Sequence, residues 1–250
     1  MIPNPIRKVL SSIQKQRVRA LLMGGQACIL YGAAEFSRDI DLAILADAPN
    51  INRLREALSD LQAEVIAAPP FHLKYLRRGH AVHFRCMHPE AFHLRIDIMS
   101  KMRGVKPFSR LWARRTTLAL PDGLSFDLMS LPDLVTAKKT QRDKDWPLIR
   151  RLVEAHYFEH RAHPVRARVE FWVRELRTPE LLVEVAEYHP RVCRRLVTVR
   201  PLLAGALASD LAGVGRGLLA EELAERESDR QYWSPLRKEL ETLRRSRIRT

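Results

Sequence analysis

Two aspartates at alternate positions of one apolar run are the residues whose spacing most clearly suggests chemistry. The run "DIDLAIL" places Asp39 and Asp41 two residues apart among isoleucine and leucine. In a strand, side chains at i and i+2 project to the same side, so both carboxylates would share one face. Like charges that close repel each other, and a hard divalent cation such as Mg²⁺ or Mn²⁺ would relieve the repulsion. The pair therefore predicts a cation-binding face on a strand.

A third carboxylate lies in another strand-like run, "LRIDIMS". Asp97 is flanked there by apolar residues, where an unpaired charge is costly. Asp97 could complete a metal site with the first two carboxylates. It could equally be a strand-end aspartate bonded to Arg95 or to a backbone amide, and the sequence leaves both interpretations open.

Two glycines, Gly24 and Gly25, stand between an apolar run and a helical pattern. A glycine pair at a strand-to-helix junction lets the backbone approach a ligand and directs helix N-terminal amides at an anion. The simpler interpretation is a tight turn. Combined with three carboxylates, however, the glycines predict a site that binds a nucleoside triphosphate through metal ions, where two metals could stabilise the attacking and leaving oxygens.

These residues need a sheet and helices to hold them in place. Hydrophobic spacing predicts a helix at the N-terminus and helices over 24–32 and 51–62. Strand-like runs cover residues 39–45, 80–87, 92–100, 116–120 and 124–129. Beyond Ser130, a helix N-cap candidate, only helical patterns remain. We therefore expect an α/β (α+β) fold: a small mixed β-sheet domain with flanking helices over 1–130, followed by an all-α region over 131–250.

Composition limits the class of protein. With 46% hydrophobic and 29% charged residues in 250, the chain is typical of globular proteins, and no run is apolar enough to span a bilayer. The N-terminus lacks the features of a secretory signal, and three scattered cysteines suggest no disulfide framework. We expect a cytoplasmic protein that does not bind membranes.

The net charge and the histidines say less about function than the aspartates and glycines do. The net charge is +14, and residues 101–150 hold 11 Lys/Arg against 5 Asp/Glu. The excess fits a polyanionic partner such as RNA about as well as it fits a generally arginine-rich composition. Five histidines over residues 72–93 have no recognised zinc-site spacing, so we expect ordinary strand and loop residues there.

At this point the sequence resembles a family. "GG", then "DID" thirteen residues later, then "RID" are similar to the signature of the nucleotidyltransferase superfamily of DNA polymerase β. Within it, the chain resembles small bacterial enzymes of abortive-infection toxin–antitoxin pairs. The resemblance covers roughly residues 15–155 and continues through "DLVTAKKTQRDKD". It implies a Mg²⁺- or Mn²⁺-dependent transferase that moves a nucleoside monophosphate from a triphosphate such as ATP to an acceptor hydroxyl and releases pyrophosphate.

The resemblance also implies roles for individual residues, grouped by function. Metal binding and catalysis would belong to Asp39, Asp41 and Asp97, and nucleotide binding to Gly24, Gly25, Ser37, Lys138 and Arg142. Lys138, Arg142 and Asp145 would share a helix face if one helix runs through them. A solvated face with a surface ion pair is the simpler interpretation.

One position departs from the family pattern. Glu35 stands where the family often has arginine, four residues before the first metal aspartate. The change favours a second hypothesis, a catalytically silent antitoxin or nucleotide-binding module of the same fold. The intact set of aspartates favours an active enzyme, with tRNA, another RNA or a toxin or antitoxin protein as partner. A plain nucleic-acid-binding protein would explain the charge but not the carboxylates.

Overall fold

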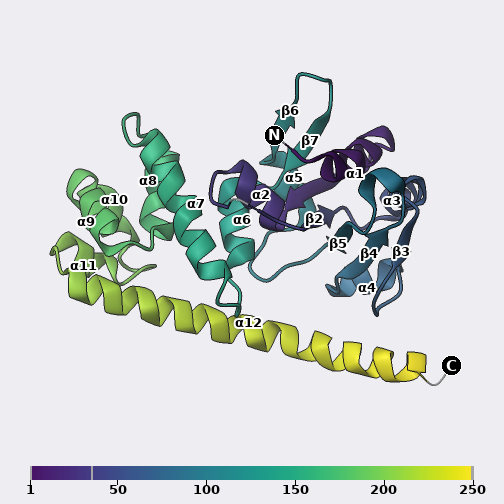
Figure 1. Ribbon diagram of the computed structural model, residues 1–250. Coiled ribbons are helices and arrows are strands. Elements are labelled where there is room, and N and C mark those ends of the chain that lie inside the picture. The colour runs from purple at the N-terminus through teal and green to yellow at the C-terminus, as the bar shows by residue number, and fades with distance from the viewer. Residues whose placement is uncertain (1, 35, 249–250) are drawn as a thin grey trace. The chain divides into compact units, whose positions relative to one another are not determined.

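The computed structural model describes residues 2–34 and 36–248, with side chains up to residue 245. These residues divide into two compact units. The first lies within residues 1–30, 34–137 and 232–250, and the second within 31–33 and 138–231. The last helix, α12 (Leu211–Ile248), contributes its first part to the second unit and its last part to the first (Figure 1).

The first unit is built on one mixed sheet of seven strands in the order β3-β4-β5-β2-β1-β7-β6. The pairs β1–β7 and β2–β5 are parallel and the others are antiparallel. The strands are β1 (Ala20–Met23), β2 (Asp39–Ile44), β3 (Ala63–Val65), β4 (Val82–Cys86), β5 (Arg95–Met99), β6 (Thr116–Ala119) and β7 (Ser125–Leu128).

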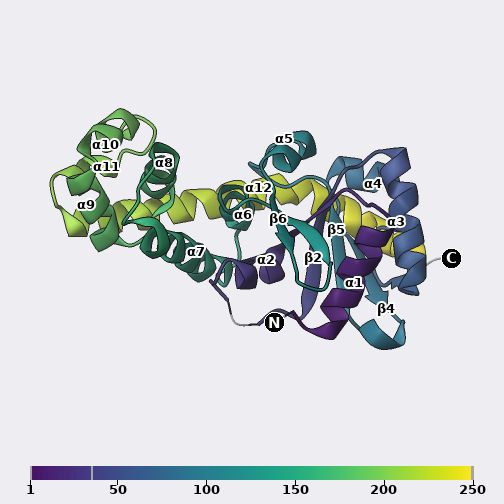
Figure 2. The ribbon, with the colours of Figure 1, turned by 90° about the horizontal axis from the view of Figure 1, so that it is seen from above.

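Helices flank this sheet. They are α1 (Asn4–Lys15), α2 (Gly24–Leu30), α3 (Ala48–Asp60), α4 (Leu73–Arg78), α5 (Phe108–Ala113) and α6 (Leu131–Lys138), with a short 3₁₀ turn, η1 (Pro89–Ala91). Helices α1 and α3 lie side by side, joined by a hydrogen bond from Ser12 Oγ to the carbonyl of Ala57 (Figure 2). The buried side chains of α1, Ile6, Val9, Leu10 and Ile13, recur at the helical spacing expected from the sequence.

The core of the sheet lies on the face away from the aspartates. Ile40 pairs in register with Ile96, and Leu42 with Ile98, and all four side chains are at most 1% exposed. Burial of such apolar surface is the main stabilising term for a sheet packed on helices. Because strand side chains alternate, the same packing leaves Asp39, Asp41 and Asp97 on the other face.

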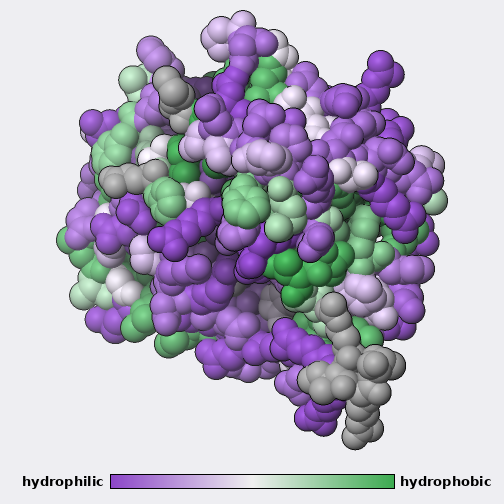
Figure 3. All heavy atoms as spheres, turned by 45° about the vertical axis from the view of Figure 1, so that its right-hand side comes forward, coloured by the Kyte–Doolittle hydropathy of each residue, from purple (hydrophilic) through white to green (hydrophobic). Residues whose placement is uncertain are grey.

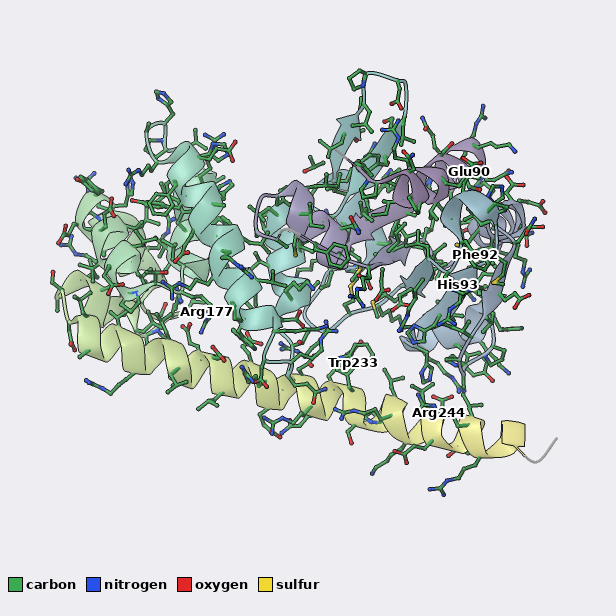
Figure 4. The ribbon with its side chains drawn as sticks, in the orientation of Figure 1. Glu90, Phe92, His93, Arg177, Trp233 and Arg244 are labelled. Carbon is green, nitrogen blue, oxygen red and sulfur yellow. The ribbon has the colours of Figure 1, made fainter. Side chains whose placement is uncertain are left out.

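The end of α12 also belongs to this unit. Its residue Glu239 pairs with His80 Nε2 at 2.9 Å and with the guanidinium of Arg78. Trp233 and Arg244 lie on the same segment (Figure 4).

The second unit is entirely helical in its described residues. It comprises α7 (Asp145–His160), α8 (Arg166–Glu175), α9 (Pro179–Tyr188), α10 (Pro190–Leu196), α11 (Leu203–Leu207) and the first part of α12. Its core includes Trp172, 1% exposed. Buried Arg200 donates to the carbonyls of Val173 and Leu176, which satisfies acceptors at the end of α8, and pairs with Glu221.

The predicted fold class, an α/β domain with a mixed sheet followed by helices, is confirmed. The strand-like runs and the N-terminal helix are found where the sequence places them. Strand β3 and helices α4 and α5 were not predicted, because segments of three to six residues are too short to show a period. Within the described residues, no helix is long and apolar enough to cross a membrane.

Candidate functional site

The register of β2 and β5 brings the three predicted aspartates to one face of the sheet. In this parallel pair Asp41 lies opposite Asp97, and Asp39 lies opposite Arg95. Neighbouring residues in register project to the same side. The face therefore carries three carboxylates and one guanidinium, on two adjacent central strands.

The glycine pair gives the neighbouring elements room to approach this face. Gly24, with φ +66°, follows β1 directly, and a Cβ added there would lie 1.8 Å from Asp41 Oδ2. A Cβ on Gly25 would lie 2.4 Å from Ser37 Oγ. Either contact is far inside van der Waals distance, so only glycine fits while Asp41 and Ser37 keep these positions. The start of α2 is thereby held close against the carboxylates.

The segment before β2 is fixed to the same helix. Gln26 Nε2 donates to the carbonyl of Ser37 at 2.9 Å, and Ser37 Oγ donates to the carbonyl of Asp39 at 3.3 Å. Ser37 thus lies between the glycines and the first aspartate. Glu35, the departure from the family pattern, lies outside the described residues.

Asp97 has two partners of its own. Arg95 forms a bidentate pair with it, Nε to Oδ1 at 2.7 Å and Nη2 to Oδ2 at 3.0 Å. His83 Nδ1, from the next strand β4, lies 2.8 Å from Oδ1. Burial alone would raise the pKa of Asp97, but the hydrogen bonds from His83 and Arg95 outweigh it and hold that pKa below its ordinary value.

The ring nitrogen of His83 faces two groups. It lies 3.0 Å from Arg95 Nη2 as well as 2.8 Å from Asp97 Oδ1. A nitrogen that donates its proton to Asp97 has no lone pair for Arg95, so only one of these contacts is a hydrogen bond in a given tautomer.

Arg95 is a cation that compensates this acidic face. Its hydrogen bond to Asp97 raises its pKa despite burial, and the charges of Asp39 and Asp41 act in the same direction. The simpler interpretation of Asp97, a partner of Arg95, thus describes the contact that is present. Arg95 is a candidate partner from the local sequence, whereas His83 comes beside Asp97 only through strand pairing.

The residue types of the face suit a hard divalent cation. Carboxylate oxygens are the ligands that Mg²⁺ and Mn²⁺ prefer, and Mg²⁺ commonly takes one or two of them together with substrate phosphates. Asp39, Asp41 and Asp97 would hold such an ion, and the glycines leave space at its edge. Among the described residues, no group of three or more Asp, Glu, His or Cys is already arranged to hold a metal ion. Asp97 faces Arg95 and His83 instead.

Lys138 and Arg142 belong to the helical unit. Lys138 Nζ lies 3.2 Å from Asp145 Oδ1, and Arg142 Nε donates to Oδ2 at 2.8 Å. No single helix runs through them: α6 ends at Lys138 and α7 begins at Asp145. The ion pair between Lys138 and Asp145 is not solvated either, because Asp145 is fully buried. Their contact with phosphates stays a prediction.

The basic stretch after Asp97 contains both engaged and exposed side chains. Arg114 forms a bidentate pair with Asp133, and Arg115 pairs with Asp127 and lies over the ring of Trp112. By contrast, Lys106 and Arg110 are exposed, and neither forms an ion pair with any side chain that the structure describes. In the view of Figure 3, hydrophilic residues cover most of the visible surface.

A cavity of about 340 Å³ lies elsewhere in the first unit. Its lining includes Leu22 and Leu42, whose side chains point away from the aspartate face. It is therefore separate from the candidate site.

Comparison with known proteins adds little to this geometry. No family model and no curated protein matches the sequence. Among solved structures, a candidate nucleotidyltransferase from H. pylori aligns over 86% of this chain and 94% of its own, with 15% identity and a TM-score of 0.39. A likeness at that score carries no weight for fold or function.

Proposed function

We propose that the chain is a divalent-metal-dependent nucleotidyltransferase that moves a nucleoside monophosphate from a nucleoside triphosphate to an acceptor hydroxyl. The observation that carries the proposal is the convergence of Asp39, Asp41 and Asp97 on one face beside the glycine pair. A structural role alone would not require three carboxylates on adjacent strands, where they repel one another.

The chain's part in the reaction follows from this geometry. The acceptor oxygen bonds to the α-phosphorus, the bond from that phosphorus to the bridging oxygen breaks, and pyrophosphate leaves. Bound metal would stabilise the charge on the attacking and leaving oxygens. The residues would position the groups: Gly24 and Gly25 would admit the triphosphate, Asp39 and Asp41 would hold the metal, and Asp97 would complete the site and accept the hydroxyl proton.

The charge supports an RNA acceptor, tRNA in particular. Lys106 and Arg110 are exposed in the stretch where the basic excess is greatest. A polyanion suits such a surface better than a cationic small molecule does. A toxin or antitoxin protein encoded as a partner would be a regulator of this activity.

The test is label transfer. Each α-³²P nucleoside triphosphate would be incubated with the protein, a cell lysate and Mg²⁺ or Mn²⁺, and label scored in RNA, protein and small molecules. We expect label from at least one nucleotide, lost with a chelator and in Asp41→Asn, and retained in Asp60→Asn, a carboxylate at the end of α3 that pairs with Lys15. Full activity in Asp41→Asn would show that the site is misassigned.

A second candidate is a nucleotide-binding module that performs no transfer. The observation that favours it is that Asp97 already forms an ion pair with Arg95 and lies against His83. It predicts nucleotide binding that Gly25→Ala weakens, with no label transferred to any acceptor.

A further inference from the structure

One guanidinium is placed among all three carboxylates of the candidate site. Arg95 lies opposite Asp39 in the strand register and two residues before Asp97 on the same face. Two nitrogens of its guanidinium, Nε and Nη2, donate to the two oxygens of Asp97 at 2.7 and 3.0 Å. We call this two-bond contact the fork. A bidentate pair of this kind is among the stronger hydrogen-bonded ion pairs in proteins.

The fork uses the oxygens that a metal would need. Both oxygens of Asp97 accept from Arg95, and Oδ1 also faces His83. The fork takes one lone pair of each oxygen, and a divalent cation beside the same carboxylate repels the guanidinium at that distance. The fork and His83 therefore oppose close binding of the ion to Asp97.

We propose that Arg95 is the counter-cation of the metal-free site and competes with the divalent ion for Asp97. Metal loading then requires the Arg95–Asp97 pair to break. This inference rests on the proposed function, because it takes the three carboxylates to be metal ligands. It adds that the chain carries its own competitor, which lowers the apparent metal affinity and stabilises the protein without metal.

The opposite role makes the opposite prediction. If Arg95 only orients Asp97 toward the ion, its removal weakens metal binding, as loss of a supporting partner does at known metal sites. If it competes, its removal tightens binding. The sign of the change therefore separates the two roles.

Arg85 offers a matched control. It is the register partner of Arg95 on β4, it projects to the same face, and it is exposed. It forms no ion pair with any described side chain. Arg85→Ala removes the same charge from the same face without removing the fork, so it measures the general electrostatic effect alone.

The experiment is calorimetric titration of the full chain with MnCl₂ at fixed pH, with bound Mn²⁺ also counted by electron paramagnetic resonance. We expect Arg95→Ala to bind Mn²⁺ about tenfold to a hundredfold more tightly than wild type, the range set by one charge-assisted pair. Arg95→Lys should fall between them, because an ammonium cannot form the fork. Arg85→Ala should change the affinity much less.

A second readout is thermal. Without metal, Arg95→Ala should melt at a lower temperature than wild type, and Mn²⁺ should raise its melting temperature by more. If Arg95→Ala does not fold, Arg95→Gln removes the charge at similar length and takes its place.

The outcomes separate the two proposals. Binding in Arg95→Ala that is weaker than wild type, or no tighter than in Arg85→Ala, overturns the competition while the metal site stands. No Mn²⁺ binding in wild type or in any Arg95 variant overturns the metal-dependent function itself.

Discussion

At the scale of single residues, the candidate site is defined by what surrounds Asp97. The carboxylate accepts from Arg95 and lies beside His83, and these contacts hold its pKa below the ordinary value. Such a carboxylate, when ionised, adds to the free energy of unfolding and so stabilises the folded protein. The contribution is complete above the ordinary aspartate pKa and is lost as pH falls through the lower pKa of the folded state.

Asp97→Asn should therefore destabilise the metal-free protein at neutral pH. We expect a loss of about 1.5–3 kcal/mol, the range for hydrogen bonds to charged groups. The difference from wild type should be constant near neutral pH and should shrink below pH 3.8, the ordinary aspartate value. Urea unfolding across this range measures it. Asp39→Asn, whose side chain accepts no bond from a described donor, should change stability less; an equal loss in both would contradict the assignment.

Gly24 gives a second prediction at this scale. Gly24→Ala combines an unfavourable φ of +66° with a Cβ 1.8 Å from Asp41 Oδ2. Gly123→Ala is the control, since its φ is +85° but nothing lies within 4 Å. The control should cost about 1–3 kcal/mol from backbone strain alone. Gly24→Ala should cost about 1–3 kcal/mol more from overpacking and should also weaken nucleotide binding. Equal effects in denaturant titrations would show that Asp41 moves aside freely.

At the scale of elements, buried ion pairs fix where two helices begin. Asp133, in the first turn of α6, accepts from Ser130 Oγ at 2.7 Å and from Arg114. Ser130 directly precedes the helix, at the position expected of a cap, but its hydroxyl bonds to the Asp133 carboxylate. Asp145, at the start of α7, accepts from Thr140 and Arg142 and pairs with Lys138. Arg114 and Lys138 are therefore structural partners whatever else they do.

The Asp145 cluster should respond as a buried charge pair does. Asp145→Ala leaves Lys138, 8% exposed, without its partner, and should cost about 3–5 kcal/mol. Lys138→Met in the same protein should recover part of that loss, because the uncompensated charge is gone. A double-mutant cycle by urea unfolding measures the coupling. Additive losses from the two substitutions would mean that the pair contributes nothing.

At the scale of the whole molecule, the dominant property is charge. The net charge of +14 spreads over both units, with the greatest excess in residues 101–150. Since Arg114 and Arg115 are engaged with Asp133 and Asp127, their replacement would disturb the fold as well as the surface. Replacing the exposed Lys106 and Arg110 tests polyanion binding with less disturbance of the fold.

We expect tRNA binding that weakens steeply with salt. Lys106→Ala with Arg110→Ala should lower the affinity and reduce the slope of log affinity against log salt by about 0.7–0.9 for each phosphate that the variant no longer neutralises. Filter binding from low to moderate salt measures both. Arg191→Ala with Arg194→Ala removes equal charge from α10 as a control. Salt-independent binding, or none at low salt, would point to a protein or small-molecule acceptor.

The sequence by itself determined the elements and the faces within them. Alternation of apolar and acidic residues in "DIDLAIL" placed Asp39 and Asp41 on one side, and the glycines marked the junction of β1 and α2. Such patterns depend on a period of two or of 3.6 residues, which a few neighbours are enough to set.

Only the tertiary structure decided which of these residues meet. The pairing of Asp41 with Asp97 and the position of Arg95 opposite Asp39 join strands far apart along the chain. The pairing of Asp97 with His83 joins two consecutive strands, and its register is likewise not set by the local pattern. Register between distant strands is set by the packing of the whole sheet, where a slip of one residue would turn every side chain to the other face. That is why the aspartates, and Arg95 as a possible partner of Asp97, could be named from the sequence, whereas the contact of His83 with Asp97 had to be found in the fold.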